Sequence, residues 1–116
     1  MDVERLADNR TVEAVPEGHL TQLAAGERTS VQHFRIEPGA VVPFHEHPHE
    51  QAGYIAQGEL TFLLGDEGDP EEVVVGPGDG YVLAGNEVHG AENRGEETVL
   101  GVDVFSPPRT DPNWAD

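Results

Sequence analysis

Short apolar runs, each ended by glycine or proline, are the feature that most restricts how this chain can fold. Its 116 residues include 14 glycines and 9 prolines. The apolar residues between them are mostly valine, leucine and alanine, and no stretch keeps the long ~3.6-residue repeat of an amphipathic helix. This pattern predicts many short strands joined by tight turns. Such strands at regular spacing are typical of an all-β sandwich or barrel.

Residues 29–37 show the clearest strand alternation. Gln32, Phe34 and Ile36 share one face, which we expect to point into the core. His33 lies on the opposite face, so we expect it at the surface or at a subunit contact, and not among metal ligands. Further strands are expected at 44–51, 54–64 with a turn at Gly58, 73–75, 81–84, 88–91 and 98–105, with short strands near 12–15 and 19–23 and an acidic loop at 66–72.

A histidine-rich stretch is the strongest functional signal, with three of the six histidines at positions 45, 47 and 49. In an extended chain, side chains two residues apart point the same way, so His45 and His47 share a face and Glu46 points away. Imidazole is the commonest protein ligand for zinc, copper, iron and nickel. Pro43 and Pro48 hold the segment extended, which favours a metal site over a solvated histidine-rich loop.

The charge of the chain excludes several classes of partner. There are 23 acidic and 6 basic residues, giving a net charge of −17, and lysine is absent. Such a field repels nucleic acids and anionic membranes, so we expect neither as a partner. Self-repulsion destabilises a compact fold in dilute salt and is relieved when salt screens it. We therefore hypothesise a halophilic source over an ordinary acidic protein.

The remaining composition predicts one soluble, cytoplasmic domain over residues 1–116. The absence of cysteine excludes disulfides, thiolate metal sites and cysteine nucleophiles. No apolar stretch approaches the ~20 residues of a membrane helix, and residues 1–4 do not begin a signal peptide. We expect a barrel core at about 29–105. The proline-rich tail 106–116 should lie across the surface, pinned by Trp114.

Two glycine-bounded stretches resemble the paired motifs of the cupin superfamily. The first contains His45-x-His47 and then, after three residues, Gln51, where the family usually has glutamate. The second contains His89 and Asn93, with alanine and asparagine at positions 84 and 86, where the family prefers proline and glycine. The resemblance implies a small, single-domain jelly-roll β-barrel, commonly a homodimer. It also implies one divalent metal ion per chain (Ni, Zn, Mn or Fe), held by His45, His47, Gln51 and His89.

The glutamine in this implied ligand set has a chemical consequence. Two histidines and one carboxylate are typical of non-haem Fe(II) oxygenases. A neutral amide at Gln51 instead leaves the ion its full charge for polarising an anionic or enolic oxygen. Alternation directs Glu50 away from this face but leaves His49 open as a ligand. Only the family spacing argues against His49.

The run from 103 to 109 resembles the ending of the single-domain pectin-degradation cupins, which open the ring of unsaturated uronates to a linear keto sugar acid. The resemblance implies that Asp103, Phe105 and Arg109 act in catalysis. An inward Asp103 would be desolvated, which raises its pKa toward values useful for proton transfer. Phe105 would share its face and wall the pocket, and Arg109 could bind a substrate carboxylate. The alternative is a solvent-facing Asp103, with Arg109 paired to a nearby carboxylate.

Three functions are compatible with these observations. The fold alone does not choose among them, because one fold supports many activities. The first is a metal-dependent isomerase of a small anionic sugar acid, with Asp103 and Arg109 as catalytic residues and Phe105 and Arg109 as substrate-binding residues. The second is a metal-dependent dioxygenase of the quercetin-cleaving kind. The third is a non-catalytic module that binds a small ligand.

Overall fold

The computed structural model describes residues 1–111, and strands dominate this part of the chain. A short 3-10 helix, η1 (Leu6–Asp8), precedes ten strands. The strands are β1 (Thr11–Val15), β2 (Gly18–Ala25), β3 (Ser30–Ile36), β4 (Val41–His45), β5 (Glu50–Gln57), β6 (Leu60–Leu64), β7 (Glu71–Val75), β8 (Gly80–Leu83), β9 (His89–Glu92) and β10 (Val99–Ser106). The expected all-β class is confirmed. The expected anchor, Trp114, lies outside the described residues.

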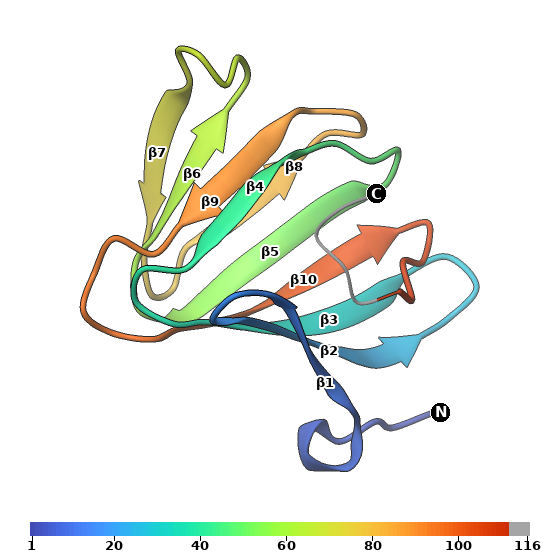
Figure 1. Ribbon diagram of the computed structural model, residues 1–116. Helices are drawn as coiled ribbons and strands as arrows, with labels where there is room; N and C mark the ends of the chain where they lie inside the picture. The colour runs from blue at the N-terminus through green and yellow to red at the C-terminus, as the bar shows by residue number, and fades with distance from the viewer. Residues whose placement is uncertain (112–116) are drawn as a thin grey trace.

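Two antiparallel sheets face each other as the walls of a jelly-roll barrel (Figure 1). One sheet has the order β1-β2-β3-β10-β5-β8, and the other has the order β4-β9-β6-β7. The last strand, β10, lies between β3 and β5 in the middle of the larger sheet. Residues near the C-terminus are thereby placed beside strands that come much earlier in the chain. None of the described residues forms a helix long and apolar enough to cross a membrane.

The inner faces of the two sheets form an apolar core that gives way to buried polar residues at one end. Along β10, the inward residues run from Val99 through Gly101 and Asp103 to Phe105, and all four are buried. Val99 pairs with Ile36 at the apolar end. The core is completed by large apolar side chains of both sheets: Leu20, Phe34, Val42, Ile55, Leu60 and Phe62. The packed apolar core therefore occupies one end of the barrel, and the buried polar residues lie at the other end.

Two boundaries differ from the sequence-based expectation. The histidine-rich segment is not one strand, because β4 ends at His45 and β5 begins at Glu50 in the other sheet. Pro48 lies in the crossing, where its missing N–H costs no ladder hydrogen bond. The acidic loop is also shorter than expected. Glu71 and Glu72 pair with β6 as the exposed start of β7.

Candidate metal centre and adjoining pocket

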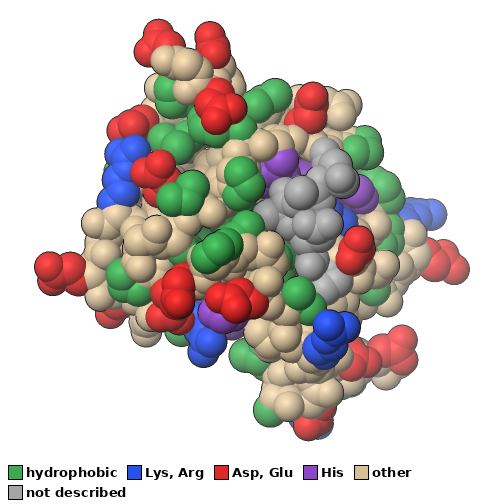
Figure 2. Space-filling model, in the orientation of Figure 1, with side chains coloured by type: hydrophobic (Ala, Val, Ile, Leu, Met, Phe, Trp, Pro, Cys, Tyr) green, Lys and Arg blue, Asp and Glu red, His purple; other side chains and the backbone are tan. Residues whose placement is uncertain are grey.

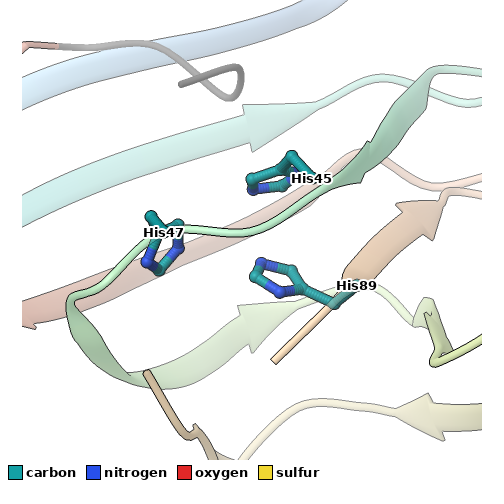
Figure 3. A group of neighbouring side chains, drawn as sticks. All are labelled: His45, His47 and His89. Carbon is teal, nitrogen blue, oxygen red and sulfur yellow. The ribbon is translucent and has the colours of Figure 1, made fainter. Parts of the chain in front are cut away.

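Two neighbouring histidines and one distant in sequence converge between the sheets. His45 ends β4, His47 lies in the crossing to β5, and His89 begins β9 (Figure 3). Pairing of β4 with β9 sets His45 opposite His89, with their ring centroids 4.3 Å apart. One ligand nitrogen from each of the three rings lies within 4.8 Å of the other two. This spacing allows a single metal ion to contact all three.

The hydrogen bonds of the rings prepare them for a metal. The Nδ1 atoms of His45, His47 and His89 lie 2.8, 3.1 and 2.7 Å from the backbone carbonyls of Pro43, His49 and Glu87. A carbonyl oxygen can only accept, so the Nδ1 of His45 and of His89 carries the hydrogen and the Nε2 carries the lone pair that a metal would use. A neutral His47 can donate either from Nδ1 to the His49 carbonyl or from Nε2 to the Gln51 Oε1. Such outer hydrogen bonds orient metal-binding histidines.

Burial also keeps the rings of His45 and His47 neutral, which is the form that binds a metal. Desolvation lowers the pKa of His45 to about 4, although the bond to Pro43 opposes this effect. The pKa of His47 is lowered first by desolvation and then by the charge of Arg109. Both rings are therefore neutral near pH 7, without help from a metal.

Gln51, which the sequence predicts as a fourth ligand, lies beside the three histidines and provides a test of whether a cation fits. Its Oε1 lies 3.0 Å from the Nε2 of His47. Its amide nitrogen donates to the Asp103 carboxylate, which fixes the amide with its oxygen toward the histidines. When the Nδ1 of His47 carries the hydrogen, the Oε1 and the Nε2 are both acceptors, and a cation between them would relieve their repulsion. The donor set therefore fits a metal ion.

Asp103 is the buried acid of the site, and only 3% of it is exposed. The Tyr81 hydroxyl donates to its Oδ1 at 2.5 Å. Desolvation raises the pKa of Asp103 to about 6, against the opposing effects of Tyr81, Gln51 and the charge of Arg109. A carboxyl with this pKa exchanges its proton readily near neutral pH. The expected inward placement of Asp103 is thus observed.

Sequence reasoning missed Tyr81, which reaches Asp103 by lying across a glycine. In the sheet, Gly53 of β5 pairs with Tyr81 on one side and with Asp103 on the other. A Cβ at Gly53 would lie 2.1 Å from the Cζ of Tyr81, so only glycine leaves room for this ring. A glycine inside a strand is the signal that could have indicated a close approach.

Phe105 and Arg109 lie beside the histidines. Phe105 is 1% exposed, and its ring packs edge-on to His47 at a centroid distance of 5.7 Å. The Arg109 Cζ lies 5.4 Å from the centre of the Phe105 ring. The Arg109 N–H donates to the Ser30 Oγ at 2.8 Å, which ties the tail to β3. Arg109 is buried, and its charge acts on the site, although the roles expected for both residues stay predictions.

A small cavity adjoins two of the histidines and the buried acid on one side and the apolar core on the other. Its volume is about 20 Å³, which is room for one water-sized group. Its polar wall consists of His45, Gln51, Tyr81, His89 and Asp103.

Figure 2 shows acidic side chains spread over the surface, with histidine side chains reaching it near the middle of the view.

The other histidines are separate from the metal centre. His49, which alternation left open, lies near His47 with a ring-centroid distance of 5.5 Å but is not part of the converging group. His33 pairs with Val102 and is half-buried on the outer face of the larger sheet. His19 pairs with Arg35 on the same face. The position of His33 on the outer face agrees with the expectation that it lies away from the core.

Known proteins are similar to this chain in sequence and in fold. A family model described as Cupin domain matches residues 32–105. The pectin degradation protein KdgF of Dickeya dadantii (strain 3937) is 38% identical over 74 residues, which span 63% of this chain and 63% of that protein. The structure of KdgF from Halomonas sp. is 27% identical, with a TM-score of 0.78, and the match covers 94% of this chain and 96% of that chain.

A more distant structure shows the fold alone. The polyketide cyclase RemF from Streptomyces resistomycificus is 24% identical, with a TM-score of 0.75, and the match covers 92% of this chain and 79% of that chain. The resemblance of the sequence to the pectin-degradation proteins is confirmed by the two KdgF matches.

Proposed function

Because this chain belongs to the cupin family, we propose that its metal centre and buried carboxyl work together as an isomerase that opens the ring of an unsaturated uronate. The observation that carries the proposal is the position of Asp103. It is buried beside the ligand Gln51 and has a pKa of about 6. An acid that both takes and returns a proton near neutral pH is what a ring-opening isomerase needs. The similarity to proteins named for pectin degradation supports this substrate class.

The reaction needs only proton transfers. The ring form of such a sugar acid has an anomeric hydroxyl, and its ring oxygen is an enol ether next to the carboxylate. Removal of the hydroxyl proton forms the aldehyde and breaks the bond between the anomeric carbon and the ring oxygen. The electron pair of that bond stays on the ring oxygen as an enolate. Return of a proton to the far carbon of the enolate double bond gives the ketone, so no oxidant is used and no water is consumed.

We assign these proton transfers to Asp103. Tyr81 and Gln51 hold its carboxyl in one orientation from two sides. Arg109 is the group that would hold the substrate carboxylate, since a guanidinium binds carboxylates through two parallel hydrogen bonds. Its buried position beside Phe105 also limits the directions in which it can point. A divalent ion on the three histidines and Gln51 would supply Lewis-acid polarisation of a substrate oxygen.

The test is direct turnover of unsaturated galacturonate monomer. Wild type is loaded separately with Zn, Mn, Ni or Fe(II), and loss of the enol ether is followed by ultraviolet absorbance and the keto product by NMR. We expect acceleration with at least one metal. No acceleration with any of them would refute the proposal. Oxygen uptake during turnover would indicate the dioxygenase alternative, and binding without turnover would indicate a non-catalytic module.

The outer face of the larger sheet supports the expected homodimer. One row of this face joins Val31, Val104, Ala52 and Val82 across four paired strands, and Val82 is 64% exposed. This row carries no carboxylate in a chain of net charge −17, so two copies can meet there without strong repulsion. Val82→Glu should therefore convert a dimer to a monomer. The molar mass of both proteins is measured by light scattering in molar salt. A wild-type monomer would contradict the assignment.

A further inference from the structure

An unbroken row of residues crosses the interior of the larger sheet beside Asp103. The strand pairings place Gln22 of β2 opposite Gln32 of β3, and Gln32 opposite Asp103 of β10. The row continues from Asp103 through Gly53 to Tyr81. Four of these five residues have polar side chains, although they lie on the side of the sheet that faces the core. Buried polar side chains need hydrogen-bond partners, so we consider the partners of each member of the row.

Gln32 is the member of the row whose hydrogen-bonding capacity is unused. It is 1% exposed, and both its Nε2 and its Oε1 are buried without a hydrogen-bond partner among residues 1–111. The neighbouring Gln22 differs at its nitrogen: its Oε1 is also buried without a partner, but its Nε2 donates to the carbonyls of Leu23 and Val31 at 3.1 and 3.4 Å. At the other end of the row, the Tyr81 hydroxyl is bound to Asp103. Gln32 alone offers a free donor together with a free acceptor.

Burying an amide with neither group paired lowers the stability of the fold. An apolar side chain of similar length would avoid this cost at the same position. Protein interiors keep such a cost chiefly where function requires the group. Gln32 stands directly across from Asp103 on the same face, and side chains in such a pair are immediate neighbours. A group that contacts the Asp103 carboxyl is therefore within reach of the Gln32 amide.

We propose that Gln32 binds a hydroxyl group of the sugar-acid substrate, directly or through one water molecule, and so positions the substrate against Asp103. This inference rests on the proposed isomerase function. An amide suits a hydroxyl because its nitrogen donates to the hydroxyl oxygen and its oxygen accepts the hydroxyl hydrogen. Gln32 is thus a positioning residue that works beside the proton-transferring acid, and it discriminates sugar acids from ligands that lack a hydroxyl at this point.

Gln32→Met is the decisive variant, because methionine keeps the length of glutamine but makes no amide hydrogen bond. If the amide is held for the substrate, the metal-loaded variant should have a Tm equal to or above that of wild type. Its kcat/KM for unsaturated galacturonate should fall by roughly tenfold or more, mainly through KM. Gln32→Leu serves the same purpose if the methionine variant does not fold.

Gln22→Met is the matched control. It makes the same chemical change one strand farther from Asp103, at an amide nitrogen that already has backbone partners. Its kcat/KM should match that of wild type. Binding is also measured without turnover, from the rise in Tm on adding ordinary galacturonate, which lacks the double bond of the proposed substrate. This rise should be smaller for Gln32→Met than for wild type or Gln22→Met.

Three results would overturn the inference on Gln32 while leaving the isomerase function standing. The first is full activity of Gln32→Met in an active wild-type background. The second is a parallel loss of Tm and activity, which indicates a structural role. The third is an equal loss of activity in Gln22→Met, which indicates a general effect of packing. An inactive wild type that does not bind galacturonate instead refutes the proposed function, and this inference with it.

Discussion

Replacing Asp103 by asparagine should stabilise the metal-free protein at pH 8 while removing its activity. Burial raises the pKa of this carboxyl from 3.8 to about 6, because the charged form is desolvated in the folded protein. Asparagine has the same shape and can still accept the hydroxyl hydrogen of Tyr81. It cannot ionise, so the variant escapes the cost of a buried charge.

The size of the effect follows from the two pKa values. One pKa unit corresponds to about 1.4 kcal/mol, so a rise from 3.8 to about 6 destabilises the ionised native state by on the order of 3 kcal/mol. Between about pH 4 and pH 6, the native state holds a proton that the unfolded chain has lost, so the free energy of unfolding of wild type falls as pH rises. The advantage of Asp103→Asn should therefore be absent below pH 4, grow through this window and level off above pH 6.

Urea unfolding of both proteins at a series of pH values measures this difference. A chelator removes metal, and a constant molar salt concentration screens the general surface charge. Asp69→Asn, which removes a carboxyl from the exposed acidic turn, is the matched control for the loss of one negative charge. With metal restored, Asp103→Asn should retain the ion but lose roughly 10²- to 10⁴-fold in kcat, the usual contribution of general acid–base catalysis.

Two outcomes would refute this reasoning. If wild type is the more stable protein at pH 8, the hydrogen bonds of Tyr81 and Gln51 and the charge of Arg109 stabilise the carboxylate more than burial destabilises it. If both proteins turn over substrate equally, Asp103 transfers no proton in the reaction.

Three further predictions concern the metal, the net charge and the substrate clamp. His47→Ala should abolish stoichiometric metal in elemental analysis, since it removes a central ligand; unchanged metal content would exclude the proposed centre. The Tm of wild type should rise as KCl increases from dilute to molar, because screening relieves the repulsion of a net charge of −17; a flat or falling curve would contradict the halophile hypothesis. Arg109→Ala should mainly raise KM in the uronate assay, or raise KM and lower kcat together if Arg109 also orients the substrate. An unchanged KM would show that another group binds the carboxylate.

The sequence alone determined the strand content, the inward face of β3 and half of the metal site. The inward face of β3 depends on a local rule, because alternation along one strand decides which side chains share a face. His45 and His47 come together because they lie two residues apart between prolines, although β4 ends at His45 and His47 lies outside the strand that the alternation assumed. The choice of Gln51 over His49 needed family spacing, since a two-residue period leaves both on the same face.

Tertiary structure decided what the chain could not specify locally, which is the pairing of distant strands. Only the alignment of β4 with β9 brings His89 to His45, and only the place of β10 between β3 and β5 brings Asp103 into the site. Tyr81 reaches Asp103 because an intervening strand has a glycine in the same row. Gln32 was correctly expected in the core, but its unused amide became visible only when its neighbours were known. Register is set by long-range contacts across both sheets, and a pattern of period two within one strand carries no information about it.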